Sequence, residues 1–269
     1  MVKKRTKDFQ RSEPSDHGMA GTRPLFSIIT VVLNGEKYLE KTIKSVISQT
    51  VDNIELIVID GGSVDNTIQL IIRYEEYISY WVSEPDKGIY DAMNKAIKVC
   101  RGNYLLFLNC GDYLLNFKVL ENVIKYMRDV SPDILYSDIY TDGKNDRELL
   151  TTKIESDFDL YRKTICHQAV FASKQVFETI GEFNTLYKIC ADREWLLRAV
   201  KAHKFELSYM NTPTSVFDRH GVSSRQRIRL RLENMKINFI YFRPRFHSYL
   251  LKQIRNKILK ILTNKLRYV

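Results

Sequence analysis

The feature that most constrains the fold is an alternation of apolar runs and amphipathic stretches between Leu25 and Tyr140. The apolar runs are short and rich in β-branched residues, as expected of strands buried on both faces of a parallel sheet. The stretches between them have the apolar spacing of helices. This order predicts a doubly wound α/β sheet with helices on both faces. Strands are expected at Leu25–Leu33, Ile54–Ile59, Tyr80–Val82, Tyr104–Leu108 and Ile134–Tyr140, and helices at Glu36–Gln49, Asp65–Tyr77, Tyr90–Cys100 and Phe117–Asp129.

The alternation weakens after about residue 141, where the turn-forming residues of Thr141–Glu148 predict a hinge. Beyond the hinge the pattern indicates fewer and less regular elements. Strands are expected at His167–Ala172 and Phe205–Tyr209, and helices at Asp192–Lys201 and Arg225–Phe239.

The positive charge of the chain is concentrated at its C-terminal end. Residues 225–269 hold 13 Lys and Arg side chains and a single acid, Glu233, so their formal charge is +12. The formal charge of the whole chain is +10, so the rest of the chain is slightly negative. Residues 246–269 combine an apolar stripe of helical period with basic side chains, which predicts an amphipathic helix on an anionic membrane surface. Two alternatives are a helix that packs on the domain or another subunit, and a nucleic-acid arm. The helical period of the apolar residues disfavours the arm.

Three features that the sequence lacks indicate the cellular compartment. The four cysteines, Cys100, Cys110, Cys166 and Cys190, have no zinc-site spacing and are expected to be reduced thiols in a cytosolic protein. Residues 1–23 are polar and basic, lack the apolar region of a signal peptide, and are expected to be disordered. No apolar run reaches the about 18 residues of a membrane-spanning helix.

Polar residues follow each of the first four strands, where an open α/β sheet binds its ligands. They are Asn34, the segment Asp60–Ser63, Asp86 and Asp112. Neither a GxGxxG nor a GxxxxGK[ST] segment is present, so the common dinucleotide and P-loop sites have no support. Carboxylates at such an edge can bind a divalent metal that neutralises a diphosphate. The pattern therefore favours a nucleotide-diphosphate ligand.

Local chemistry offers a simpler explanation for each residue. Asp60 and Asp86 have the setting of turn aspartates, and Asp112 and Asp192 could each cap a following helix. Asn34 could bond only to its own loop. The placement of Asn34 and three of these acids at successive strand ends on one edge argues for a shared site.

The runs FSIITVVLNGEKYLEKTIKSVISQTVDNIELIVIDGGSVDNT and EPDKGIYDAMNKAIKVCRGNYLLFLNCGD resemble the nucleotide-sugar domain of family 2 glycosyltransferases. The segments HQAVFAS, IGEFN, ADREWLLRA and HGVSS resemble the acceptor half and the late loop of that family. The resemblance covers about residues 25–220 and is closest to the branch that builds bacterial surface polysaccharides. It implies the GT-A fold, a Rossmann-like doubly wound mixed sheet, here followed by basic amphipathic helices.

The resemblance also implies roles for single residues. Asp112 matches the last acid of the strand-end motif that binds Mg²⁺ or Mn²⁺ and the donor diphosphate, and Gly111 stands where the first acid usually is. Asp60 matches the first acid of the segment usually written DDGS, and Gly61 replaces the second. Asp192 matches the general base. The residues expected to bind the nucleotide-sugar donor are Val31, Asn34, Asp60, Gly61, Ser63, Asp86 and Asp112.

The activity that the resemblance implies is an inverting transfer of a sugar from a nucleotide-diphosphate sugar to a lipid-linked glycan acceptor, in surface polysaccharide synthesis at the cytoplasmic face of the plasma membrane. The corresponding organisation is a nucleotide-sugar half at 24–141, an acceptor half at 142–224 and a membrane-associating tail at 225–269. The missing acids at Gly61 and Gly111 leave one alternative, a non-catalytic module that binds nucleotide sugars. The presence of both Asp112 and Asp192 favours the enzyme.

Overall fold

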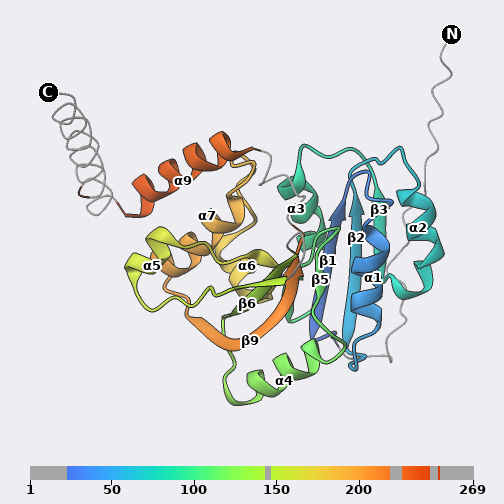
Figure 1. Ribbon diagram of the computed structural model, residues 1–269, viewed down its shortest axis with the longest axis horizontal. Helices are drawn as coiled ribbons and strands as arrows, with labels where there is room; N and C mark the ends of the chain where they lie inside the picture. Colours follow the sequence, from blue (N-terminus) through green and yellow to red (C-terminus); the bar gives the residue numbers. More distant parts are fainter. Residues whose placement is uncertain (1–22, 143–146, 219–225, 243–247, 249–269) are drawn as a thin grey trace, which may run out of the picture.

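The computed structural model describes residues 23–142, 147–218, 226–242 and 248. Nine strands within these residues form one mixed sheet with helices on both faces (Figure 1). The strands are β1 (Phe26–Val32), β2 (Ile54–Asp60), β3 (Tyr80–Ser83), β4 (Tyr104–Phe107), β5 (Tyr113–Leu114), β6 (Ile134–Asp142), β7 (Arg147–Leu150), β8 (Val170–Ser173) and β9 (Leu207–Phe217). Their order across the sheet is β3-β2-β1-β4-β8-β6-β9-β5, and β7 pairs with β6.

The helices alternate with the first strands as the sequence predicts. The α-helices are α1 (Leu39–Ile47), α2 (Thr67–Arg73), α3 (Ile89–Val99), α4 (Val119–Asp129), α5 (Asp157–Arg162), α6 (Lys174–Ile180), α7 (Ala191–Leu197) and α9 (Arg227–Tyr241). Strands β1 to β4 are parallel neighbours, with β1 between β2 and β4. Their carboxyl ends therefore meet at one edge of the sheet, as the sequence predicts for the site.

Beyond β4 the sheet is mixed rather than parallel, as the resemblance implies. The neighbour of β4 is β8, which runs antiparallel to it and separates it from β6. Phe171 in β8 is fully buried and pairs with Leu106 on one side and Leu135 on the other. A strand from the second half of the chain is thus inserted between two strands of the first half, and both halves share one sheet.

Several boundaries also differ from the sequence-based prediction. The expected hinge at Thr141–Glu148 is part of a β-hairpin, in which Thr141 pairs with Glu148. The strand expected at Phe205–Tyr209 is the eleven-residue β9, which pairs with β6 along a bulged register. The strand expected at His167–Ala172 begins as a 3₁₀ turn, His167–Ala169, that leads into β8. Four short elements, β5, β7, α5 and α6, have no counterpart in the prediction, because each is too short to show a period.

Two apolar layers hold the helices on the sheet. Buried side chains of α1, α2 and α4 pack on one face, and those of α3, α5, α6 and α7 pack on the other. Alternate residues of β1 serve the two layers, since Ile28 belongs to the first and Ile29 to the second. Burial on both faces explains why the strands read as continuous apolar runs.

Helix α9, the first part of the predicted tail, packs against α7 at one end of the molecule (Figure 1). Its Ile237 is fully buried. Glu233 accepts hydrogen bonds from three consecutive backbone N–H groups, those of residues 188–190, at 2.9–3.0 Å. The only acid of the basic segment therefore holds the chain just before α7. The helix predicted at 246–269 and the disorder predicted for residues 1–22 lie outside the described residues.

The structure bears on two expectations, reduced cysteines and the lack of a membrane-spanning helix. Cys100, Cys110, Cys166 and Cys190 are all unpaired thiols. Among the residues that the structure describes, no helix has both the length and the apolar character needed to span a bilayer.

The role of Glu233 can be tested by comparing it with its exposed ion-pair partner. Glu233→Ala leaves three backbone donors without their acceptor and should lower the free energy of unfolding by about 2–4 kcal/mol. Arg229 pairs with Glu233 at 3.5 Å from an exposed position, so Arg229→Ala should cost less than about 1 kcal/mol. Urea unfolding of both variants measures the difference. Equal effects would show that α9 is not held through Glu233.

Candidate active site

The loops after β1 and β2 form one hydrogen-bonded unit. The Asn34 backbone N–H donates to Ser63 Oγ at 2.6 Å, and the Asn34 side-chain oxygen accepts from the Val64 backbone N–H at 2.9 Å. Asn34 holds a left-handed backbone conformation, with φ of 52°. Asn34 and Ser63, both predicted to bind the nucleotide sugar, are therefore in contact. Val31 lies deeper, with its side chain in the core and its carbonyl bonded to the Cys110 N–H.

Asp60 is fully buried and its carboxylate is used by its own loop. Oδ2 accepts hydrogen bonds from the backbone N–H groups of Gly62 and Ser63 at 3.0 and 2.9 Å, and from the Ser83 hydroxyl at 2.6 Å. The Ser63 hydroxyl donates to Oδ1. The contacts agree with the turn-aspartate alternative: Asp60 shapes the loop that carries Ser63.

The glycine at position 61 has a structural reason. A Cβ atom at Gly61 would overlap Oδ2 of Asp86, so a side chain could not fit there without moving that carboxylate. Oδ1 of Asp86 accepts from the Gly88 backbone N–H at 2.8 Å, which fixes the turn after β3. Asp86 thus fills the space that a second acid at position 61 would need.

A similar replacement occurs beside Asp112. Gly111 has φ of +102°, and a Cβ atom there would lie 3.0 Å from Oδ2 of Asp218. The Asp218 backbone N–H donates to Oδ1 of Asp112 at 3.0 Å. Asp218, directly after β9, therefore places a carboxylate beside Gly111, the position at which the motif usually has its first acid. Sequence analysis did not identify Asp218, because it lies 106 residues from Asp112.

Asp112 itself is 4% exposed, and both of its oxygens have donors. Oδ2 accepts from Nε2 of Gln168 at 2.9 Å, and Oδ1 from the Asp218 backbone. Burial raises the pKa of Asp112 to about 6, although the charge of His167 and the hydrogen bonds from Asp218 and Gln168 lower it. The carboxylate is thus held in a fixed orientation at the strand edge.

The donor set at Asp112 can be compared with what a divalent metal requires. Within the described part of the chain, no three His, Cys, Asp or Glu side chains form a cluster that could hold a metal. The oxygens of Asp112 and Asp218 still fit a cation shared with a substrate, because Mg²⁺ is commonly bound by one or two carboxylates plus phosphates and water. Mn²⁺ prefers the same ligands.

Asp192 lies at the start of α7, where three groups from three elements contact its carboxylate. Oδ1 accepts from the Tyr90 hydroxyl at 2.9 Å and from the Arg193 backbone N–H at 2.8 Å, and Oδ2 lies 3.0 Å from Nδ1 of His167. The Tyr90 hydroxyl also contacts the Ile189 carbonyl. Burial raises the pKa of Asp192, but the hydrogen bond and charge of His167 outweigh it and the pKa is lowered. Asp192 is therefore ionised at neutral pH.

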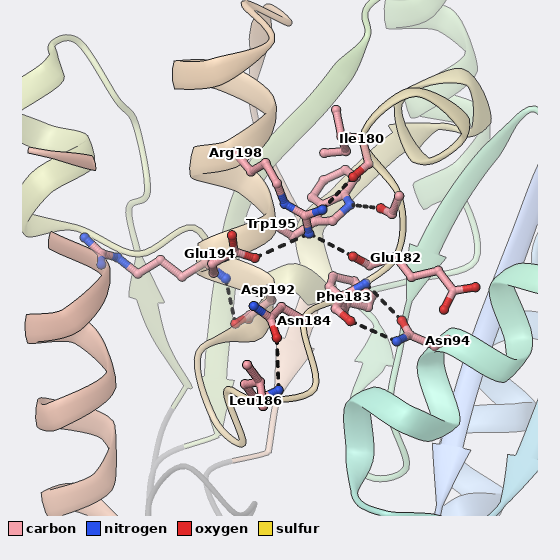
Figure 2. Close-up of polar contacts among 12 residues, drawn as sticks. Asn94, Ile180, Glu182, Phe183, Asn184, Leu186, Asp192, Glu194, Trp195 and Arg198 are labelled. Carbon is pink, nitrogen blue, oxygen red and sulfur yellow. Dashed lines mark hydrogen bonds and ion pairs between the residues drawn. The ribbon is translucent and has the colours of Figure 1, made fainter. Parts of the chain in front are cut away.

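The chain before α7 is clamped from two sides, as Figure 2 shows. Asn94 of α3 exchanges two hydrogen bonds with the Phe183 backbone, at 2.9 and 3.0 Å. Arg198 donates to the carbonyls of Ile180 and Glu182, and Trp195 donates to that of Gly181. These contacts join α3 to α7 across the loop and make the position of Asp192 rigid.

The structure brings Asp112 and Asp192 to the same small region through neighbouring residues of one turn. His167 contacts Asp192, and Gln168 contacts Asp112. Sequence analysis predicted a strand at His167–Ala172 and gave the HQAVFAS segment as part of a resemblance, but spacing alone gave no signal that His167, Gln168 or Tyr90 belongs to a site. His220 and the late loop from residue 219 lie outside the described residues.

A family model and several known proteins match this chain. The model of a family described as glycosyl transferase family 2 matches residues 27–181. A glycosyltransferase of PGL/p-HBAD biosynthesis from Mycobacterium bovis is 30% identical over 202 residues, which cover 74% of this chain and 78% of that protein.

Two solved structures share the fold at low sequence identity. The first is residues 1–349 of TarS from S. aureus in complex with UDP-GlcNAc, with a TM-score of 0.60, 18% identity, and coverage of 72% of this chain and 58% of that one. The second is the mannosyltransferase PcManGT from Pyrobaculum calidifontis with GDP-Man and Mn²⁺, with a TM-score of 0.64, 17% identity, and coverage of 85% and 69%. Both confirm the expected mixed α/β fold.

Proposed function

Because the chain belongs to glycosyltransferase family 2, we propose that it transfers a sugar from a nucleoside-diphosphate sugar to an acceptor hydroxyl by a single inverting displacement. The observation that carries the proposal is the joint anchoring of Asp112 and Asp192 by Gln168 and His167. One carboxylate faces the edge where a diphosphate would bind, and the other is an ionised base beside it. The TarS and PcManGT complexes with nucleotide sugars support the choice of donor class.

The contacts of Asp192 indicate which of its oxygens receives the proton. Each carboxylate oxygen offers about two lone-pair directions. Among the described residues, Oδ1 accepts two hydrogen bonds, whereas Oδ2 accepts one, from His167. Oδ2 therefore has a lone-pair direction left with which to accept a hydrogen bond from an acceptor hydroxyl. As the hydroxyl oxygen attacks the anomeric carbon, its proton passes to Oδ2, and the nucleoside diphosphate leaves from the opposite face of the sugar.

Asp112 and Asp218 are the residues that would hold a divalent cation in this reaction. Such a cation, Mg²⁺ or Mn²⁺, would neutralise the charge that develops on the leaving diphosphate. The Mn²⁺ in the PcManGT complex supports the same choice of ion. Asp60 and Asn34 keep the loop that carries Ser63 in position for the nucleotide, and Asp86 fills the space beside Gly61.

The acceptor side of the proposal concerns the membrane. We propose a lipid-linked glycan acceptor of surface-polysaccharide synthesis, met at the cytoplasmic face of the plasma membrane. The charge of +12 on residues 225–269 supports this location. So does the outer face of α9, where Ile228 and Leu232 are 78% and 61% exposed beside the exposed Arg227 and Arg231. Apolar side chains flanked by basic ones suit an anionic bilayer surface.

Replacement of the base tests the catalytic part of the proposal. Asp192→Asn should lower turnover by at least about 10²-fold, because the amide cannot accept the proton. The affinity for the donor should change less than about threefold, since Asp192 faces the acceptor side. UDP-, GDP- and dTDP-hexoses would be screened with Mn²⁺, and nucleoside-diphosphate release measured with water or a glycan as acceptor. Donor binding by the wild-type protein without any turnover would favour the non-catalytic binding module.

Metal binding tests the pairing of Asp112 with Asp218. Asp218→Asn should weaken Mn²⁺ binding in the presence of the nucleoside diphosphate by about tenfold, because one of the two carboxylates is lost. The loss of free Mn²⁺ signal in electron paramagnetic resonance measures the affinity without reference to activity. Asp52→Asn, at an exposed position after α1, is the control. Equal Mn²⁺ affinity of the Asp218→Asn and wild-type proteins would remove Asp218 from the site.

Truncation after residue 245 tests the membrane proposal. The truncated chain keeps α9 with Glu233, Asn238 and Tyr241, which contact α7 and its preceding loop, so it should fold and bind the donor. Its co-sedimentation with vesicles of phosphatidylglycerol and phosphatidylcholine should be lost, while the full chain binds them and is released at high salt. A full-length protein that ignores these vesicles would contradict the membrane location and leave the transferase proposal intact.

A further inference from the structure

The 3₁₀ turn His167–Ala169 has a special place in the sheet. It lies directly before β8, whose residues pair with β4 on one side and β6 on the other. The backbone of the turn is therefore fixed by two neighbouring strands. Ala169 is fully buried and Gln168 is 3% exposed. The two polar side chains of the turn are held where the sheet places them.

Each of these side chains contacts a different carboxylate of the candidate active site. Nδ1 of His167 lies 3.0 Å from Oδ2 of Asp192, and Nε2 of Gln168 donates to Oδ2 of Asp112 at 2.9 Å. Asp112 follows β4, and Asp192 begins α7. The dipeptide thus connects the strand edge that would bind the diphosphate with the helix that carries the base.

The other nitrogen of the His167 ring is also engaged. Nε2 of His167 lies 2.8 Å from Nδ2 of Asn109, three residues before Asp112. An ionised carboxylate can only accept, so Nδ1 of His167 carries a proton and donates it to Oδ2 of Asp192, whether or not Nε2 is also protonated. The orientation of His167 toward the base is therefore the same in both states.

We propose that His167 and Gln168 are positioning residues that fix the two carboxylates relative to each other, Gln168 acting on donor binding and His167 on the proton transfer. The inference rests on the proposed function, because it needs Asp112 to face the donor and Asp192 to be the base. Gln168 holds Asp112 in the orientation that binds the diphosphate and its cation. His167 holds Oδ2 of Asp192, the oxygen that receives the acceptor proton.

The two residues should consequently affect different steps. Without the Gln168 amide, Asp112 can turn away from the donor, so the dissociation constant for the nucleoside diphosphate with Mn²⁺ should rise. Without the His167 ring, Asp192 loses the one hydrogen-bond donor that the described residues provide to Oδ2, so turnover at a saturating concentration of the nucleotide sugar should fall. Loss of such an outer contact typically changes affinity or activity by about 10–100-fold. A residue with a purely structural role would change both quantities together or neither.

The chemistry of the side chains provides matched variants for His167. The amide nitrogen of asparagine is bonded to Cγ, as Nδ1 of histidine is, whereas that of glutamine is one bond farther out. His167→Asn can therefore keep the contact with Asp192, and His167→Gln cannot. For Gln168, methionine keeps the length of the side chain and removes its donor.

The experiment measures two quantities for each variant of the full chain. Calorimetric titration gives the dissociation constant for UDP and for GDP with Mn²⁺, and release of the nucleoside diphosphate at saturating donor gives turnover. We expect Gln168→Met to raise the dissociation constant about tenfold and change turnover less than threefold. We expect His167→Gln to lower turnover about tenfold with binding within twofold, and His167→Asn to recover most of that loss.

Several results would overturn the proposal. One is equal turnover of His167→Asn and His167→Gln, and another is a Gln168→Met variant that binds the nucleoside diphosphate as the wild type does. A third is the unfolding of both His167→Gln and the conservative His167→Asn, as judged by circular dichroism, because His167 would then be needed for folding rather than for positioning. Failure of the proposed function is a separate outcome, recognised by a wild-type protein that releases no nucleoside diphosphate from any donor in the screen.

Discussion

The pairing of β8 between β4 and β6 is the constraint on which the rest of this structure depends. Four residues, Val170–Ser173, hydrogen-bond to strands from an earlier part of the chain on both sides. An antiparallel strand needs no crossover helix, so a short segment can enter the sheet directly from a turn. That turn is then fixed beside the end of β4. The position of the candidate active site follows from this pairing, since β4 leads to Asp112.

Carboxylates that lose water are costly, and Asp60 and Asp112 are buried while Asp192 is largely covered. Each is stabilised by hydrogen bonds from backbone N–H groups or polar side chains, which offset the loss of water. The partners differ among the three acids. The donors to Asp60 include Gly62 and Ser63 of its own loop, whereas Asp112 and Asp192 are held by donors from distant segments, Gln168 and His167.

Helix α9 attaches the basic C-terminal segment to the folded body. Its inner face contacts α7 and the preceding loop through Glu233, Asn238 and Tyr241, while its outer face presents Ile228 and Leu232. A helix with these two faces can hold the start of α7 and meet another surface at the same time. The predicted tail at 225–269 therefore begins with a helix, α9, that belongs to the folded body.

The sequence by itself determined the first four strands, their helices and the edge where Asn34, Asp86 and Asp112 lie, because burial on both faces leaves a local apolar pattern that can be read residue by residue. Local chemistry also indicated the turn contacts that Asp60 makes. Only the tertiary structure decided the place of β8, the contacts of His167 and Gln168, and the use of Asp86 and Asp218 beside Gly61 and Gly111. These features join residues that are 25 to 106 positions apart. No local period records such contacts, because strand pairing between distant segments depends on the shape of the assembled sheet.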